Sequence, residues 1–173
     1  YPFNPASLAL GSDATFVARS IDRNPKHMQE MIKRMGKHKG LALLEIFQNC
    51  NIFNDGAFSV LTEKDTKEDS VLILEHGKPM VFGKNQDKGI KLDGPHPVVV
   101  DISNGKYSKD DLWVHDEFSV SPVHAMILAH LDDNRDLPTP VGVFRQYFKE
   151  TYDGGIANQI KYIKEKKGEG DLE

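Results

Sequence analysis

Residues 41–50 have the sequence LALLEIFQNC, in which a nearly continuous apolar run is followed by a polar turn. The first seven residues have the length of a strand, and an uninterrupted apolar strand is typical of a parallel sheet that is covered on both faces. Residues 15–19, which include Phe16 and Val17, predict a second strand upstream of this run. The two segments together indicate an α/β fold.

The strongest helix signal of the chain lies between these two predicted strands. Asn24 is a typical N-terminal cap, and Pro25 occupies the first helical position. Methionine and isoleucine side chains then recur with helical spacing at positions 28, 31, 32 and 35. Because a strand, a helix and a strand in this order form a right-handed crossover in nearly all sheets, we predict a βαβ unit with parallel strands.

The remainder of the chain predicts shorter elements separated by Gly, Pro, Asn and Asp. A short helix is expected at residues 5–10, and the charged residues 63–70 predict a solvated helix or loop. Strands are expected at residues 71–74, 80–82, 98–102, 112–114 and 141–144. Two more helices are expected, one after Pro122 and one that carries Ile156, Ile160 and Ile163.

The composition of the 173 residues fits one domain of ordinary size or one compact unit with an appendage. Hydrophobic residues make up 39% and charged residues 28%, which is near the average of globular proteins and unlike disordered or collagen-like chains. The net charge of -4 is small and of the wrong sign for a nucleic-acid-binding protein. The longest apolar runs, such as residues 41–44, are much shorter than the roughly 20 residues of a membrane helix, so we expect no membrane partner and a cytoplasmic location.

The densest polar segment of the chain is QNCNIFNDG, residues 48–56, directly after the apolar strand. Ligands of open α/β sheets bind beyond the carboxyl ends of the strands, so this position makes Cys50 a candidate functional residue. Its thiol could be a metal or cluster ligand, a nucleophile, or a buried small side chain. Because Cys50 is the only cysteine, this chain alone forms neither an internal disulfide nor an all-cysteine metal site.

The other chemistry-bearing residues show no diagnostic spacing. The seven histidines form no His-Glu-x-x-His pattern and are expected to be solvated or hydrogen-bonded side chains. The adjacent carboxylates at positions 110 and 111, and at 132 and 133, are typical of turns and caps. No dinucleotide or Walker fingerprint of glycines is present. The residues alone therefore predict an α/β domain with one suggestive cysteine loop.

Three blocks of the sequence are similar to a known family. The first block, residues 4–58, is NPASLALGSDATFVARSIDRNPKHMQEMIKRMGKHKGLALLEIFQNCNIFNDGAF. The others are LEHGKPMVFG at residues 74–83 and PTPVGVFR followed by TYD within residues 138–153. These blocks resemble the beta subunit of thiamine-diphosphate-dependent 2-oxoacid:ferredoxin oxidoreductases, particularly the 2-oxoglutarate type. The resemblance covers essentially the whole chain, and the segment that ends in QNCNIFNDGAF carries most of its specificity.

The resemblance implies a fold and a division of the chain. The family's beta subunit is roughly twice this size. Its earlier half carries a Cys-x-x-Cys pair, a further cysteine and a Gly-Asp-Gly segment, which hold an iron-sulfur cluster and the magnesium diphosphate, and none of these motifs occurs here. The chain thus resembles the carboxyl-terminal half of such a subunit. We expect the second half of a parallel-sheet thiamine-diphosphate-binding domain at residues 1–58 and a carboxyl-terminal mixed α/β extension at residues 59–173.

The resemblance also implies a role for the cysteine. Cys50 is expected to be the fourth thiolate of a 4Fe-4S cluster whose other three ligands lie in the missing half, since such a cluster takes four thiolates and this chain supplies one. The neighbouring Asn49, Asn51, Asn54 and Asp55 are expected to shape the loop by hydrogen bonds. Residues that bind thiamine diphosphate or Mg2+ are not assigned, and no residue is given a catalytic role.

The implied parent enzyme oxidatively decarboxylates a 2-oxoacid, in the first place 2-oxoglutarate, with coenzyme A to an acyl-CoA and CO2. Its cofactors would be thiamine diphosphate, Mg2+ and the 4Fe-4S cluster, which passes electrons to ferredoxin. The implied partners are the alpha subunit of the same enzyme, ferredoxin, the 2-oxoacid and coenzyme A. The isolated fragment is expected to be inactive, and half of a sheet is expected to leave an unpaired edge and an apolar face.

Two other functions remain open at this point. The missing cofactor motifs favour a catalytically silent structural or interaction module. Cys50 and one histidine could instead serve an unrelated thiol hydrolase, which requires a thiol with a lowered pKa and a base within hydrogen-bonding reach.

Overall fold

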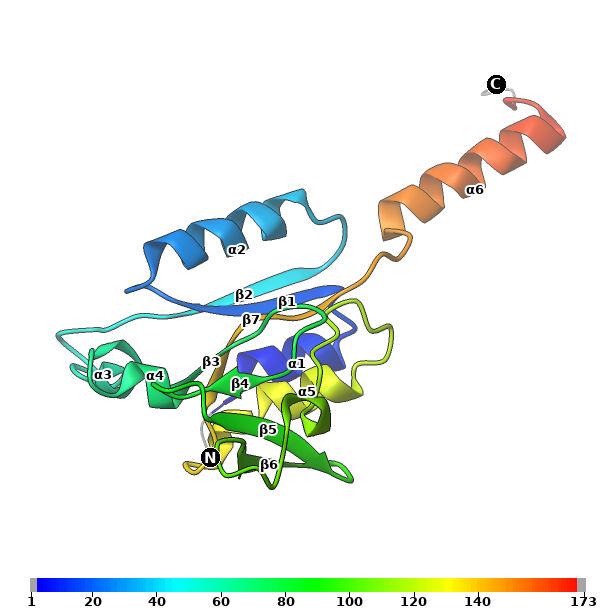
Figure 1. Ribbon diagram of the computed structural model, residues 1–173. Helices are drawn as coiled ribbons and strands as arrows, with labels where there is room; N and C mark the ends of the chain where they lie inside the picture. The colour runs from blue at the N-terminus through cyan, green and yellow to red at the C-terminus, as the bar shows by residue number, and fades with distance from the viewer. Residues whose placement is uncertain (1–2, 171–173) are drawn as a thin grey trace.

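The main sheet of the protein joins strands from both ends of the sequence. The structure, a computed structural model, describes residues 3–170. The sheet contains β1 (Phe16–Ile21), β2 (Ala42–Phe47), β3 (Val71–Ile73) and β7 (Thr139–Gln146), in the order β2-β1-β7-β3. β1 runs parallel to β2 and β3 runs parallel to β7, whereas β1 and β7 are antiparallel. This mixed, mostly parallel sheet confirms the predicted α/β class (Figure 1).

The predicted strand-helix-strand unit is present. Helix α2 (Pro25–Lys37) begins where Asn24 Oδ1 accepts a hydrogen bond from the His27 backbone N–H at 3.3 Å. The flanking strands pair in parallel, from Phe16 opposite Ala42 to Ile21 opposite Phe47. The cap, the proline and the spacing of the methionines therefore predict both the helix and the direction of the strand that follows it.

The burial of the two strands differs from the prediction. The apolar run that includes β2 was expected inside the sheet, but β2 is an edge strand, mostly half-buried, and its Ile46 is 38% exposed. Every residue of β1 is buried instead, because β2 and β7 flank it on both sides. The outer side of β2 has no strand partner among residues 3–170, which agrees with the predicted unpaired edge.

Helices cover both faces of the main sheet. On one face, Met31 of α2 packs with Phe16 and Ala18 of β1 and with Val143 of β7. On the other face, α1 (Pro5–Gly11) and α5 (Val123–Ala129) pack against residues of β1 and β7 in the largest hydrophobic cluster. Figure 1 shows α2 on one side of the sheet and α1 and α5 on the other. The result is a three-layer arrangement in which alternate residues of β1 serve opposite faces.

A second, antiparallel sheet packs beside the first. It contains β4 (Val81–Phe82), β5 (Lys88–Asp93) and β6 (His96–Asp101), in that order. The strand predicted at residues 112–114 is wrong, since this segment makes only an isolated bridge, Val114 with Pro79, after a 3-10 turn (Lys109–Asp111). β5 was not predicted from the sequence. It forms a hairpin with β6, in which Asp93 pairs with His96 across Gly94 and Pro95.

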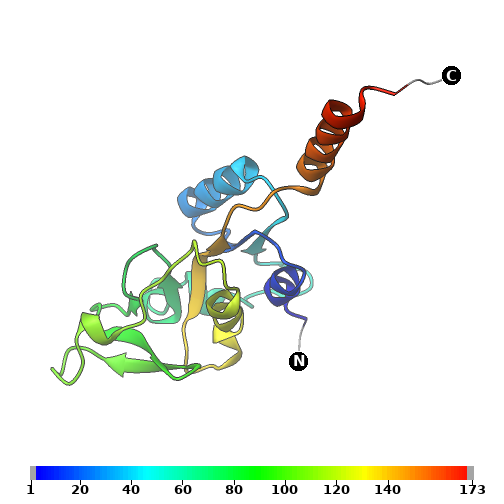
Figure 2. The same ribbon diagram turned by 90° about the vertical axis from the view of Figure 1, so that its right-hand side faces the viewer.

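The remaining elements are short or lie outside the sheets. α3 (Ser59–Thr62) and α4 (Lys67–Ser70) occupy the charged segment after the cysteine loop, and a 3-10 turn (Leu131–Asp133) follows α5. Helix α6 (Tyr152–Lys167) contains no buried residue and extends away from the sheets (Figures 1 and 2). Within residues 3–170, no helix combines the length and the apolar character needed to span a bilayer.

The predicted division after residue 58 falls inside the main sheet. β1 and β2 precede this point, while β3 and β7 follow it and continue the same sheet. The division of the chain into residues 1–58 and 59–173 stays a prediction, with its outermost ends beyond the described residues.

Candidate functional site

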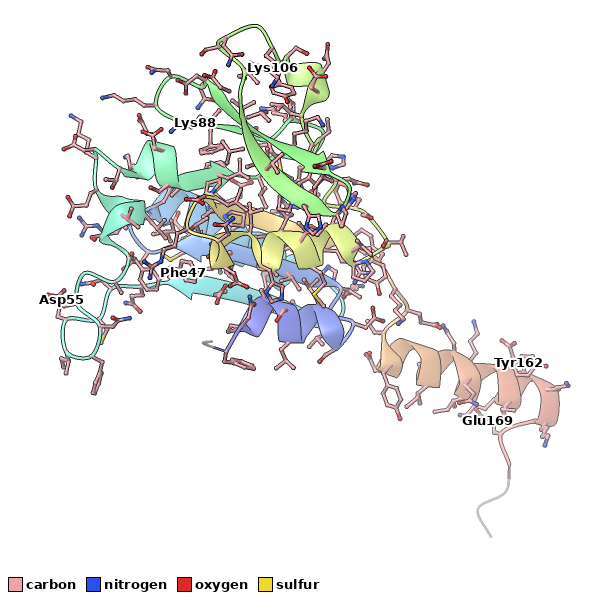
Figure 3. The ribbon with its side chains drawn as sticks, turned by 90° about the horizontal axis from the view of Figure 1, so that it is seen from below. Phe47, Asp55, Lys88, Lys106, Tyr162 and Glu169 are labelled. Atoms are coloured by element: carbon pink, nitrogen blue, oxygen red, sulfur yellow. The ribbon has the colours of Figure 1, made fainter. Side chains whose placement is uncertain are left out.

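The cysteine loop begins at the carboxyl end of β2, where the sequence predicts it. Figure 3 shows the labelled Phe47 and Asp55 at one end of the molecule, opposite the labelled Tyr162 and Glu169 of α6. Residues 48–57 form turns between β2 and the short α3. The loop therefore projects from the end of the sheet at which ligands bind in open α/β folds.

Two phenylalanines close the base of this loop. The rings of Phe47, before the loop, and Phe58, after it, are stacked with centroids 4.6 Å apart and planes 10° apart. Both pack into a small hydrophobic cluster with the buried Ile21, Leu61 and Val141. Because this contact holds the two ends of the loop together, less conformational entropy is lost when the residues between them become ordered.

The buried Arg19 of β1 contacts two residues near the carboxyl end of β2. Arg19 of β1 is 3% exposed, and its Nε lies 2.7 Å from Oε2 of Glu45 on β2. Its Nη1 lies 3.1 Å from Oδ2 of Asp132, in the turn after α5. The guanidinium carbon also lies 4.8 Å from the centre of the Phe47 ring. Two carboxylates thus compensate a charge that burial would otherwise make costly, and Phe47 is fixed at the start of the loop.

Asn49 connects the two sides of the loop. Its Nδ2 donates to Oδ1 of Asn51 at 2.7 Å and to Oδ1 of Asp55 at 2.9 Å. Its Oδ1 accepts a hydrogen bond from the Gly56 backbone N–H at 2.8 Å. The predicted structural role of Asn49, Asn51 and Asp55 is confirmed by these bonds. Asn54 contributes through its backbone, whose N–H donates to the carbonyl oxygen of Cys50 at 2.9 Å.

The thiol of Cys50 faces backbone donors. Cys50 is half-buried, and the backbone N–H groups of Phe53 and Ile52, followed by that of Asn54, lower the pKa of its thiol from the ordinary value. Such donors stabilise a thiolate, which is the form that binds metals and attacks electrophiles. Ile52 and Phe53 are 84% and 90% exposed. The loop therefore presents a stabilised sulfur next to two unburied apolar side chains.

This chain supplies a single ligand to any metal site at this loop. Among residues 3–170, no group of three or more His, Cys, Asp and Glu side chains could hold a metal ion. The thiolate-stabilising backbone around Cys50 does fit one corner of an iron-sulfur cluster, because N–H donors to the ligating sulfur are a normal feature of such centres. Further ligands would have to come from polypeptide other than residues 3–170.

The histidines are placed as the sequence predicts, in structural or exposed positions. Five of them have polar partners: His27 with Ser20, His38 with Thr15, His76 with Asp116, His115 with the Val143 carbonyl, and His130 with Asp133. His124 lies edge-on to the ring of Trp113. None of the hydrogen bonds found among the described residues joins a histidine to Cys50, so a thiol-base pair has no structural support.

Acidification is expected to destabilise the fold through His115. Its ring is buried and its Nε2 lies 2.7 Å from the carbonyl oxygen of Val143. Burial lowers the pKa of His115, so between that value and the ordinary value of 6.5 the unfolded chain binds more protons than the folded chain. The free energy of unfolding should therefore fall as the pH drops below about 6.5. Urea denaturation of the chain between pH 8 and pH 5 measures this slope.

The His115→Gln variant separates this effect from general acid destabilisation. Glutamine keeps a donor for the Val143 carbonyl but does not titrate in this range. We expect the variant to lose stability less steeply than the original chain as the pH falls. Since burial also lowers the pKa of His27 and His38, part of the slope should persist. An identical slope in the variant would contradict the role of His115.

Comparison with known proteins extends the resemblance seen in the sequence. No family model matches the chain. The 2-oxoglutarate oxidoreductase subunit KorB of Mycobacterium tuberculosis is 38% identical over 160 residues, which are 92% of this chain and 42% of that protein. The 2-oxoacid:ferredoxin oxidoreductase beta subunit of Saccharolobus solfataricus is 48% identical over 52 residues, which are 30% of this chain and 17% of that protein. The chain is homologous to these beta subunits.

The fold of this beta-subunit homologue has a counterpart among solved structures. A 2-oxoglutarate:ferredoxin oxidoreductase from Magnetococcus marinus, solved with 2-oxoglutarate, coenzyme A and succinyl-CoA bound, matches with a TM-score of 0.57. The match covers 99% of this chain and 41% of that chain at 23% identity, so it concerns the fold. The beta-subunit homologue thus spans about two fifths of the length of the M. tuberculosis relative and of the solved chain.

The sequence predicts Cys50 of this homologue as a candidate residue, but it does not predict the contacts of Arg19 or the exposure of the neighbouring apolar side chains. Arg19 has no visible partner in the sequence, because Glu45 and Asp132 come from distant segments. The exposure of Ile52 and Phe53 was also missed. One signal was available, since two large apolar residues within an otherwise polar turn are unusual unless another surface covers them.

Proposed function

We propose that this chain forms part of the beta subunit of a 2-oxoacid:ferredoxin oxidoreductase of the 2-oxoglutarate type. The observation that carries this proposal is the 38% identity to a 2-oxoglutarate oxidoreductase subunit along 92% of the chain. A similarity of this extent spans both the cysteine loop and the second sheet, so it is not limited to one motif. The match covers 42% of that relative, which supports an activity that belongs to an assembly larger than this chain.

The reaction of that assembly would convert a 2-oxoacid and coenzyme A to an acyl-CoA and CO2. Two electrons and a proton are released, and the electrons pass one at a time to ferredoxin. When bound, thiamine diphosphate with Mg2+ supplies the electron sink for decarboxylation and a 4Fe-4S cluster supplies one-electron transfer. No residue of this chain is assigned to thiamine diphosphate or Mg2+. Its alpha subunit, ferredoxin, the 2-oxoacid and coenzyme A are the proposed partners.

Cys50 is the residue that we assign to the electron path. Cys50 is half-buried, and the backbone N–H groups of Phe53 and Ile52 lower the pKa of its thiol, which favours the thiolate needed for ligation. The Asn49 hydrogen bonds and the stack of Phe47 on Phe58 hold this geometry within the chain itself. The loop would therefore offer a preformed sulfur to a cluster completed by three other thiolates.

We also propose how the chain contributes to the larger fold. Residues 1–58 would form the latter part of the thiamine-diphosphate-binding domain, and residues 59–173 its carboxyl-terminal extension. The unpaired outer edge of β2 and its half-buried side chains support this assignment, since the rest of such a domain could continue the sheet there.

Co-expression with the remainder of the beta subunit and with an alpha subunit from a related enzyme tests the proposal. The three polypeptides should co-purify and reduce ferredoxin only when 2-oxoglutarate and coenzyme A are both present. Omission of this chain should abolish ferredoxin reduction. Assembly without any 2-oxoacid-dependent reduction would contradict the proposed reaction and favour a catalytically silent interaction module.

A further inference from the structure

A cavity of about 660 Å³ lies beside β3 and is also lined by residues of β1 and β7. It adjoins the hydrophobic cluster at the base of the cysteine loop, but none of residues 48–57 lines it. This volume is typical of small-molecule sites. Its lining comes from segments that are distant in the sequence: the end of β1 with the turn after it, the α3–α4 segment, β3, β4 with the turn after it, and β7. A hollow built by five separate segments is a feature of the folded chain and not of a single loop.

Three basic side chains line this cavity. Arg23 comes from the turn between β1 and α2, Lys67 from α4, and Lys84 from the turn between β4 and β5. None of the three forms an ion pair within residues 3–170. The carboxylates in the lining are Glu68 and Glu75, and Glu75 is already paired with Lys78. The cavity lining thus carries three basic and two acidic side chains, and the charge of Glu75 is compensated by Lys78.

The segments that carry the two lysines are fixed to each other. The backbone N–H of Gly83 donates to the carbonyl oxygen of Glu68 at 2.9 Å. Nζ of Lys88 lies 2.7 Å from Oδ1 of Asp69, which ties β5 to α4. Lys67 and Lys84 therefore project from neighbouring backbone positions that are held in place before any ligand arrives. Such preorganisation lowers the entropic cost of binding.

The inner wall of the cavity is apolar. It includes Ile21 from β1, Leu61 from α3, Val141 from β7 and Phe82 from β4, all of which are buried. Ile73 of β3 also lines the cavity and remains 45% exposed. The site thus combines an apolar floor with a basic rim. A ligand that fits both needs a flat or apolar body and a compact group of negative charge.

We propose that this cavity binds the nucleoside diphosphate group of a small molecule, with the base on the apolar floor and the phosphates between Arg23, Lys67 and Lys84. Arginine and lysine are the usual phosphate-binding side chains, and three of them match a group of two to three negative charges. A free nucleotide and coenzyme A carry the same chemistry. Cys50 does not line this cavity, and the proposal does not depend on the proposed redox function.

Titration of the isotope-labelled chain with ADP tests the site directly. Backbone signals of residues around the cavity, such as Leu61, Ile73 and Gly83, should shift with ADP in a saturable manner. Adenosine, which lacks the phosphates, and inorganic pyrophosphate, which lacks the apolar body, should each bind at least tenfold more weakly. Coenzyme A in the same titration distinguishes the two sources of the group. Tighter binding of coenzyme A than of ADP identifies coenzyme A as the ligand, and weaker binding identifies a free nucleotide.

Two double variants distinguish binding of ADP at this site from nonspecific attraction of ADP to lysine side chains. Lys67→Gln with Lys84→Gln should raise the dissociation constant for ADP at least tenfold, because it removes two of the three rim charges. Lys106→Gln with Lys109→Gln changes the net charge equally outside the cavity lining and should leave that constant unchanged. The proposal is overturned if ADP causes no shifts at millimolar concentration, if the shifts lie elsewhere, or if both double variants weaken binding equally.

Discussion

Replacing Cys50 with alanine is expected to remove the proposed iron-sulfur cluster from the proposed oxidoreductase assembly. A 4Fe-4S cluster takes four protein ligands, and Cys50 is the only thiol that this chain supplies. Alanine also leaves the backbone N–H groups of Ile52 and Phe53 without the thiolate that they stabilise. We expect iron and acid-labile sulfide to fall at least tenfold and ferredoxin reduction to fall with them. The visible absorption of the purified complex is the direct measurement.

The matched control for this substitution lies just beyond the loop. Ser59 is the first residue of α3, and Ser59→Ala removes a similarly small polar atom without touching the thiol or the Asn49 hydrogen bonds. This variant should keep its cluster and its rate of ferredoxin reduction. Full cluster content in Cys50→Ala would refute the ligand role of the thiol, while the homology of the chain to the beta subunits would stand. Unchanged cluster content with lost turnover would point to the thiol as a nucleophile.

The position of the candidate site could be predicted from the sequence because it depends on local order. An apolar strand followed by a polar, cysteine-containing turn fixes where the thiol lies relative to the sheet. The support beneath it could not be predicted, since Asp132 is 113 residues from its partner Arg19. No local pattern distinguishes an arginine that will be buried between two carboxylates from one on the surface.

Errors in the predicted fold have identifiable causes. The apolar β2 lies at a sheet edge because β7, from the far end of the chain, occupies the other side of β1. Strand β5 was missed because its sequence, KGIKLD, is rich in residues that are uncommon in strands. Its alternating Ile90 and Leu92, followed by the Gly94-Pro95 turn, were an available hairpin signal. Residues 112–114 have strand-like composition but cross the second sheet without forming a ladder.

Replacing Gly142, the only glycine in the four strands of the main sheet, with alanine is expected to destabilise the protein strongly. Gly142 lies in β7 and has a φ of 135°, a backbone region that residues with a Cβ rarely adopt. A Cβ at this position would lie 2.9 Å from Cβ of Leu74 and 3.0 Å from its carbonyl oxygen. Leu74 is itself held to β7, because its N–H donates to the carbonyl oxygen of Val141 at 2.8 Å. Neither side can move away without breaking a sheet contact.

The position of Gly142 explains why relaxation is difficult. β7 is an inner strand, and its pairing with β1 shifts register two residues further on, at Phe144, which lies between the partners of Val17 and Ala18. A glycine in a strand often marks such an irregularity or a close backbone approach. Strain in φ and overpacking against Leu74 should together cost about 3 kcal/mol or more. Against a typical total stability of about 5–15 kcal/mol, this loss should lower the midpoint of urea denaturation markedly.

Gly36 provides the opposite case within the same chain. It lies in α2, and no heavy atom approaches within 4 Å of a Cβ built there. Gly36→Ala should therefore raise the free energy of unfolding by about 0.5–1 kcal/mol, because alanine favours the helix and restricts the unfolded chain. Urea denaturation of both variants under one condition shows directly whether the two substitutions change the free energy of unfolding in opposite directions. Equal small effects at the two positions would show that β7 can shift away from Leu74, and would contradict a fixed inner strand.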